Sequence, residues 1–171
     1  TDCLFSGFYL NELLMKLLAR QDAHPRLFDA YGETLGALAT QARSEDEATL
    51  RAFELMLLRE TGVLPELDCS TLTQEPLQPD RGYALRPESG LVQAAADELS
   101  LSAAQCQALE TALQAQHAQA LRQATTAALP ALKAQLRAVL AYHLGSPQLR
   151  SRQAMLEVRR LLDAPVERSS P

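Results

Sequence analysis

The chain has 171 residues, of which 47% are hydrophobic and 22% charged, and its formal net charge is −5. This composition is that of an ordinary globular protein. No apolar run approaches the roughly 20 residues that a membrane span requires, and no basic leader precedes the first helical pattern, so a membrane anchor and a secretion signal are excluded and we expect a cytoplasmic protein.

Acidic and basic residues are unevenly distributed along the chain. Residues 1–80 contain 14 acidic and 6 basic residues, a net charge of −8, whereas residues 81–171 contain 7 acidic and 10 basic residues, a net charge of +3. The imbalance is sharpest over residues 111–162, where seven bases accompany the single acid Glu157. We therefore expect an anionic partner to be drawn to the second half of the chain.

Three amphipathic helices are predicted in the first part of the chain. Apolar residues recur at helical spacing over residues 5–20 and again over residues 27–38, so two helices should pack antiparallel there. A third helix should begin at a capping box formed by Ser44 and Glu47, because each side chain can satisfy a backbone amide that has no helical partner. Gly62 is suited to end that helix.

Residues 63–93 form an irregular insert in this pattern. Helical periodicity disappears there, and turn-forming residues gather: Pro65, Pro76, Pro79, Pro87 and Gly90. Residues 81–86 and 91–93 could form a short β-hairpin around the turn between them.

Helices are predicted again in the last part of the chain. The alanine- and leucine-rich sequence from Ser100 favours one or two helices on propensity, and Pro130 should start a new helix that runs to residue 144. Gly145 should end that helix, and a final helix is expected over about residues 148–162.

These elements predict an all-α protein, a bundle of about six to seven helices. A single domain should span residues 1–165, and residues 166–171 should form a disordered tail. The three cysteines, Cys3, Cys69 and Cys106, are odd in number and widely spaced, which indicates free thiols rather than a disulfide framework.

Residues typical of an active site are not found. His24, His117 and His143 have no cysteine or carboxylate at metal-ligand spacing, and the sequence contains neither a glycine-rich phosphate loop nor a nucleophile elbow. Acidic residues 45–47 are explained by the positive end of a helix dipole. We predict that the chain is not an enzyme, has no catalytic residue and requires no cofactor.

Several segments carry a family resemblance in their order and spacing: residues 5–18, 24–31, 50–58 with 62–65, and 142–145 with 149–152. Three of them are the most specific, namely Tyr-Leu-Asn-Glu-Leu-Leu at residues 9–14, Leu-Arg-Ala-Phe-Glu at residues 50–54 and Leu-Arg-Ser-Arg at residues 149–152. Over nearly the whole chain this combination resembles the helical part of the RecO family of DNA repair proteins.

The resemblance implies a non-enzymatic mediator of recombinational repair. Such a protein binds single- and double-stranded DNA, anneals complementary strands, engages the single-stranded-DNA-binding protein SSB, and with RecR helps to load RecA. RecO proteins normally begin with an OB-fold barrel of about 80 residues, which this sequence lacks. We therefore expect the chain to keep peptide recognition better than strand annealing. The alternative is a purely structural helical scaffold that packs the missing barrel and binds no ligand of its own.

Some RecO proteins hold zinc with two cysteine pairs in the irregular insert. Cys69 falls where the first of these cysteines would lie, but Leu72 occupies the position three residues further on, and no second pair occurs near Gly90. One thiolate cannot complete a tetrahedral zinc site, so we predict no metal.

The SSB tail is acidic and ends in an apolar residue with a free carboxylate, so its receptor needs a cation beside an apolar pocket. Arg51 matches the family's arginine, and we predict that it binds the carboxylate with Phe53, Leu55 and Leu58 as apolar walls. The alternative is that Arg51 forms a surface ion pair with Glu47 or Glu54.

Four further basic residues are predicted to contact DNA phosphates: Lys133, Arg137, Arg150 and Arg152. Tyr142 is the only aromatic residue in this basic stretch, so binding should be independent of sequence, weak in this chain and sensitive to salt. The alternative is a solvated helix face, or pairing with the acidic first half of the chain.

Overall fold

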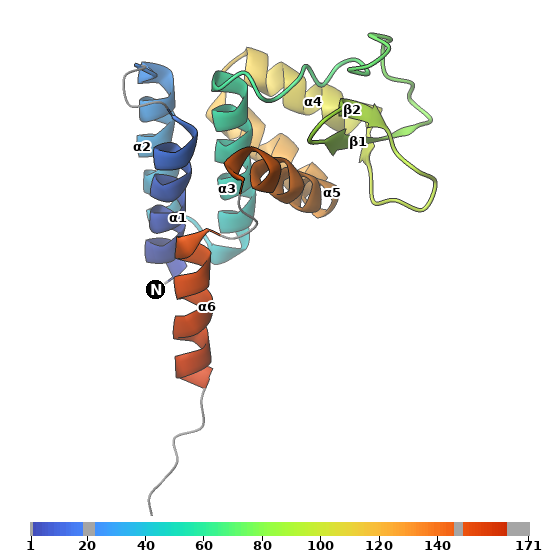
Figure 1. The fold of residues 1–171 in the computed structure, drawn as a ribbon. Coiled ribbons are helices and arrows are strands. Elements are labelled where there is room, and N and C mark those ends of the chain that lie inside the picture. Colours follow the sequence, from blue (N-terminus) through green and yellow to red (C-terminus); the bar gives the residue numbers. More distant parts are fainter. Residues whose placement is uncertain (1, 19–22, 146–148, 164–171) are drawn as a thin grey trace, which may run out of the picture.

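The computed structural model describes residues 2–18, 23–145 and 149–163 (Figure 1). Within these ranges the helices are α1 (Asp2–Leu17), α2 (Pro25–Thr40), α3 (Arg43–Glu60), α4 (Ala103–Gln114), α5 (Ala118–Leu144) and α6 (Arg150–Asp163). The strands are β1 (Gly82–Arg86), β2 (Gly90–Gln93) and β3 (Leu101–Ser102). The predicted helical bundle is confirmed, and so is the hairpin within its irregular insert.

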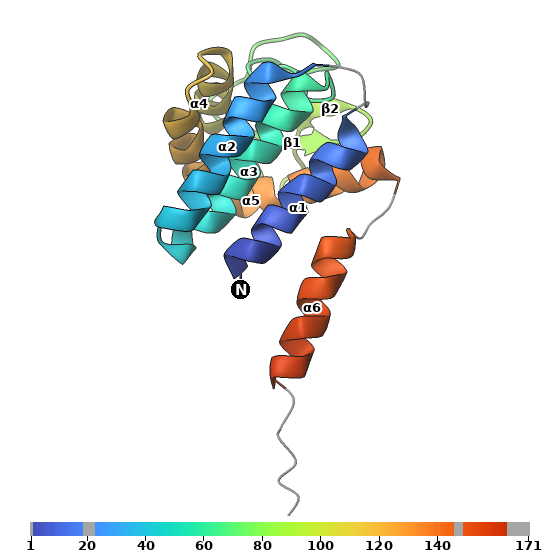
Figure 2. The same ribbon diagram turned by 90° about the vertical axis from the view of Figure 1, so that its left-hand side faces the viewer.

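Helix α3 lies at the centre of the bundle. Helices α1, α2 and α3 run side by side in alternating directions, and α5 crosses the other side of α3 (Figures 1 and 2). Because neighbours cover α3 on several sides, eight of its residues are buried, including the polar Thr49 and the charged Glu54. Ring packing adds to this core, since Tyr31 of α2 meets Phe53 edge-on with ring centroids 6.2 Å apart.

The predicted capping box at the start of α3 is wrong. The helix begins at Arg43, and its N-cap is Ala42, which has an extended backbone but no side chain able to accept a hydrogen bond. Ser44 therefore lies inside the first turn, beyond the position that a capping side chain must occupy. A capping box does occur at α4, where Ser102 and Gln105 each accept from the other's backbone amide.

Pro130 does not start a new helix, as predicted, but lies inside α5. Proline has no amide proton, so the helical ladder loses a hydrogen bond near this point. The side chain of Gln105 donates to the carbonyl of Ala127 at 2.8 Å, which gives one carbonyl of the preceding turn a partner from α4. Burial of Ala128, Ala131 and Leu132 around the proline then stabilises one continuous helix.

The buried side-chain amide of Gln135 links the small sheet to α5. Its order is β2-β1-β3, and both pairs are antiparallel, with Arg86 opposite Gly90 at the hairpin turn. The side chain of Gln135 on α5 accepts from the Leu85 amide at 2.9 Å and donates to the Leu99 carbonyl at 3.3 Å. These bonds satisfy backbone groups that would otherwise be buried without a partner.

Two glycines end helices in left-handed conformations, as predicted. Gly62 follows α3 with φ +74°, and Gly145 follows α5 with φ +63°. Among the described residues, no helix combines the length and the hydropathy needed to cross a membrane. Cys3, Cys69 and Cys106 are free thiols, with Cys3 exposed and Cys106 buried.

Candidate functional site

A groove of about 490 Å³ lies between α1, α3, α5 and α6, and we call it the four-helix groove. It is lined by Phe5, Ser6, Tyr9, Arg43, Asp46, Glu47, Leu50, Arg51, Lys133, Arg137, Leu140, Ala141, Leu144, Leu149, Ser151 and Met155. Apolar residues come from all four helices or the residue just before α6, whereas the basic residues among the described side chains come from α3 and α5. The groove therefore places cations beside apolar walls, the combination that an acidic peptide with an apolar end requires.

The cations of the groove differ in how far they are already paired. Lys133 of α5 forms an ion pair with Glu47 of α3 at 2.5 Å, and 44% and 38% of the two side chains are exposed. Arg137, one turn after Lys133, makes no hydrogen bond or ion pair with any residue that the structure describes. The charge of Arg137 acts on the buried Glu54 and opposes the rise of its pKa, but no ion pair with a described residue would have to break before an incoming carboxylate binds Arg137.

The guanidinium of Arg51 is bound by the buried carboxylate of Glu54. One terminal nitrogen of its guanidinium donates to both oxygens of Glu54, at 2.6 and 2.7 Å, and the Tyr9 hydroxyl donates to the same carboxylate. Glu54 is completely buried, and this burial raises its pKa in spite of Arg51 and Tyr9. Burial and the negative Glu54 likewise raise the pKa of Tyr9. The Arg51 Nε has no partner among the described residues.

The prediction for the walls beside Arg51 is not supported. Arg51 lines the groove, but Phe53, Leu55 and Leu58 are 1%, 0% and 0% exposed and belong to the core. Because α3 is covered by α2 as well as α5, residues that neighbour Arg51 in sequence face the interior of the domain. Leu50 lines the groove next to Arg51, and the other apolar walls come from distant segments. The ion pair with Glu54 that we considered for Arg51 is present, but it is buried rather than at the surface.

The four predicted DNA-binding residues separate into two groups. Lys133 and Arg137 lie in the groove, beside Arg51. Arg150 is exposed in the first turn of α6 and does not line the groove, and the side chain of Arg152 lies outside the described residues. The groove thus combines residues that the sequence assigned to two different partners.

A carboxylate on α1 holds the first turn of α6. Glu12 accepts from the backbone amides of Arg150 and Ser151, each at 2.9 Å, and from the Ser151 hydroxyl at 2.7 Å, while Lys16 lies 3.2 Å away. Partial burial opposes ionisation of Glu12, but the hydrogen bonds from Ser151 and Arg150 outweigh it and lower its pKa to about 2. The sequence marked Glu12 only as part of a family motif, since nothing local indicates a contact 138 residues away.

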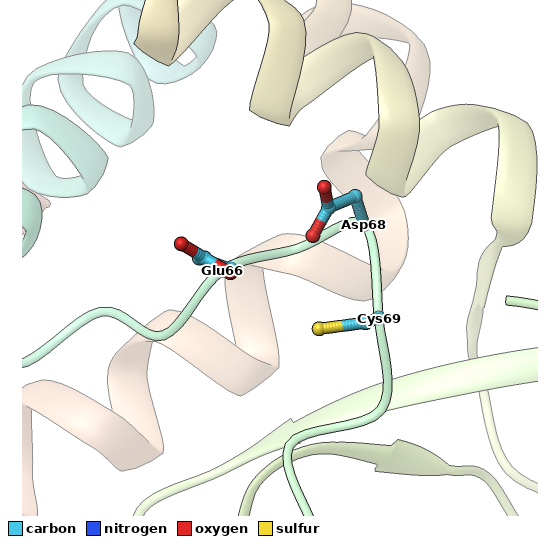
Figure 3. Close-up of side chains that lie close together, drawn as sticks. All are labelled: Glu66, Asp68 and Cys69. Atoms are coloured by element: carbon cyan, nitrogen blue, oxygen red, sulfur yellow. The ribbon is translucent and has the colours of Figure 1, made fainter. Parts of the chain in front are cut away.

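A second cluster lies in the insert. One atom each of Glu66, Asp68 and Cys69 that could ligate a metal, a carboxylate oxygen or the Sγ, lies within 4.8 Å of the others (Figure 3). The two carboxylates were not anticipated as neighbours of Cys69. Burial and the negative Asp68 and Glu66 raise the pKa of the Cys69 thiol, which disfavours the thiolate that zinc requires. Leu72 is 71% exposed where a second cysteine would stand. The cluster does not fit a zinc site built from two cysteine pairs.

Comparison with known proteins gives one family. Residues 2–153 match the family model described as "Recombination protein O C terminal". The chain is 48% identical over 171 aligned residues to the DNA repair protein RecO of Acidovorax ebreus (strain TPSY), and 50% identical over 162 residues to that of Polaromonas naphthalenivorans (strain CJ2). Each alignment covers 94% of this chain and 65% of the relative, so the chain spans about two thirds of the length of these relatives. The resemblance read from the sequence is thereby confirmed: the chain belongs to the RecO family.

Proposed function

We propose that this chain acts in recombinational DNA repair by binding the acidic tail of SSB in the four-helix groove. The observation that carries the proposal is that the exposed Arg137, which has no ion-pair partner among the described residues, lies in one groove with Lys133, Arg51 and apolar walls. The relatives named DNA repair protein RecO support the repair role. Binding of this kind needs no catalytic group, so the chain works as a mediator rather than an enzyme.

The carboxylate of the tail would be bound chiefly by Arg137. Arg51 already gives one terminal nitrogen to Glu54, so it supplies a second, partly satisfied cation rather than the primary anchor. The apolar terminal side chain would pack against Phe5, Leu140 and Met155. Acidic residues further from the tail's end would approach Lys133, whose exposed ion pair with Glu47 can exchange partners at little cost.

The proposal includes DNA binding, but the groove residues cannot bind DNA and the SSB tail at the same time. Lys133 and Arg137 can bind either DNA phosphates or the tail, so the two ligands should compete for them. Arg150 is exposed outside the groove and could contact phosphates while the tail is bound. Contacts with RecR, strand annealing and RecA loading would be shared with parts of RecO proteins that precede this region in the relatives.

The proposal is tested by fluorescence anisotropy with a labelled peptide of acidic residues that ends in phenylalanine with a free carboxylate. We expect binding by the wild-type chain at low salt and at least tenfold weaker binding by Arg137→Ala, since a charge-assisted hydrogen bond is lost. Arg26→Ala is the matched control, because Arg26 is exposed on α2 outside the groove. Absence of wild-type binding at high micromolar peptide would overturn the proposal.

A second candidate function is that of a scaffold for another part of a RecO protein. Leu4, Phe8 and Met15 are 60%, 51% and 74% exposed and recur at helical spacing on α1, outside the groove. Such a stripe favours a packing partner for α1. This function is distinguished from the first by a Phe8→Ser variant, which should leave peptide binding unchanged if the groove is the binding site.

A further inference from the structure

Helix α6 stands apart from the rest of the bundle. It extends away from the other helices, and its main contact is with α1 (Figures 1 and 2). Among the side chains of α6 that the structure describes, Leu156 is 46% exposed, Arg150 and Arg160 are exposed, and none is buried. Its position depends on what binds it at its first turn.

The first turn of α6 is bound by Glu12. In any helix the first amides have no acceptor within the helix, and in α6 the Gln153 amide donates to the Leu149 carbonyl at 3.1 Å across the first turn. Glu12 supplies the missing acceptors for Arg150 and Ser151, one carboxylate oxygen to each amide at 2.9 Å. A negative group is also favoured at the positive end of the helix dipole.

The same turn forms part of the four-helix groove. Leu149, Ser151 and Met155 line it, and Ser151 also donates its hydroxyl to Glu12 at 2.7 Å. Leu149 is buried, which shows that the residue just before α6 is already packed against the body. Glu12 itself is not among the residues that line the groove.

We propose that Glu12 is a positioning residue for the groove: by capping the first turn of α6 it holds Leu149, Ser151 and Met155 in place as the wall that a bound peptide contacts. This inference rests on the proposed function of the groove. It assigns a role to the Tyr-Leu-Asn-Glu-Leu-Leu segment at residues 9–14. The Tyr9 hydroxyl donates to Glu54, the partner of Arg51, and Glu12 binds the first turn of α6.

Glutamate is suited to this role by charge and by reach. Three donors converge on its two oxygens, and a neutral amide could offer only one accepting oxygen to them. Without the cap, α6 would sample many orientations, and a peptide would have to order it on binding. That ordering lowers affinity even though no contact with the peptide has been removed.

The test uses Glu12→Gln with two readouts. Hydrogen exchange followed by NMR reports the amides of Arg150 and Ser151, and anisotropy reports affinity for the acidic peptide ending in phenylalanine. We expect at least tenfold faster exchange of both amides and five- to tenfold weaker peptide binding. Glu60→Gln is the matched control, because Glu60 is exposed, lies outside the groove and makes no hydrogen bond or ion pair with the described residues.

Each outcome decides the inference. Unchanged exchange in Glu12→Gln would overturn it, and so would faster exchange with unchanged peptide affinity. Faster exchange in a protein whose wild type binds no peptide would overturn the proposed function and leave the cap in place. If Glu12→Gln does not fold, Glu12→Asp replaces it: this variant keeps the charge but has a shorter reach, and both effects should appear at intermediate size.

Discussion

Helix α3 contributes to two arginine–glutamate pairs, one at its middle and one near its C-terminal end, and they are built differently. Arg59 binds both oxygens of Glu110, at 3.0 and 2.7 Å, and Glu110 also accepts from the Leu67 amide and the Gln114 side chain. That pair joins α3, α4 and the insert. Arg51 and Glu54 lie on the same helix, and their further partner is Tyr9 at the groove.

The pKa values of the two carboxylates shift in opposite directions. Burial opposes ionisation of both, but the hydrogen bonds from Arg59 and Leu67 lower the pKa of Glu110, whereas the pKa of Glu54 remains raised. A carboxylate with a lowered pKa stabilises the fold at neutral pH, and one with a raised pKa is held there at a cost. The Glu110 pair therefore contributes to stability at neutral pH, and we propose that the Glu54 pair orients Arg51 in the groove.

The largest expected effect comes from removing the charge of Glu110. Glu110→Gln should lower the free energy of unfolding by about 2–3 kcal/mol, less than the full value for a buried pair because Arg59 is 27% exposed. The loss for Glu54→Gln should be smaller, because removing a carboxylate whose ionisation burial opposes offsets part of the cost of leaving Arg51 without its partner. Urea unfolding at pH 7 measures both. Equal losses would break the comparison.

A smaller effect is expected at α6 when the pH falls. The pKa of Glu12 is lowered from 4.5 to about 2, so its contribution is complete above pH 4.5 and is lost as the pH falls toward 2. We expect the cap to contribute about 1–2 kcal/mol to local stability. Hydrogen exchange of the Ser151 amide from pH 5 to pH 2.5 measures it, and after correction for intrinsic rates Glu12→Gln should show no such loss.

The smallest expected effect is a gain of affinity at the groove. Glu47 competes with an acidic peptide for Lys133, so Glu47→Gln should strengthen peptide binding by about two- to threefold, a small change because the pair is exposed. Glu45→Gln is the control, since Glu45 is exposed in the same turn of α3 but does not line the groove. Weaker binding by Glu47→Gln would show that Glu47 supports the site rather than competing for it.

The sequence was sufficient for most of the fold because helix periodicity and helix-ending glycines are local signals. It placed the hairpin in the insert and the ends of α3 and α5 near Gly62 and Gly145. It was wrong about Pro130, because the packing that carries α5 through a proline comes from other elements. Local propensity has no access to such contacts.

The groove was predicted only in part, for a similar reason. The family resemblance selected Arg51, and the basic stretch in the second half selected Lys133 and Arg137; the structure brings the three together. The apolar walls were not predictable, because they come from segments such as Phe5 and Met155 that approach only in the folded state. Phe53 was chosen for its nearness to Arg51 in sequence, but on a helix surrounded by others sequence neighbours point into different environments.

The walls of the groove have a consequence for synthesis on the ribosome. They include Phe5 and Tyr9 near one end of the sequence and Leu149 and Met155 near the other. The ribosome makes α1, α3 and α5 before α6, so a nascent chain can bury its core while the groove still lacks one side. Because α6 is made after α1, α3 and α5, the binding site becomes available only once Leu149, Ser151 and Met155 have been made.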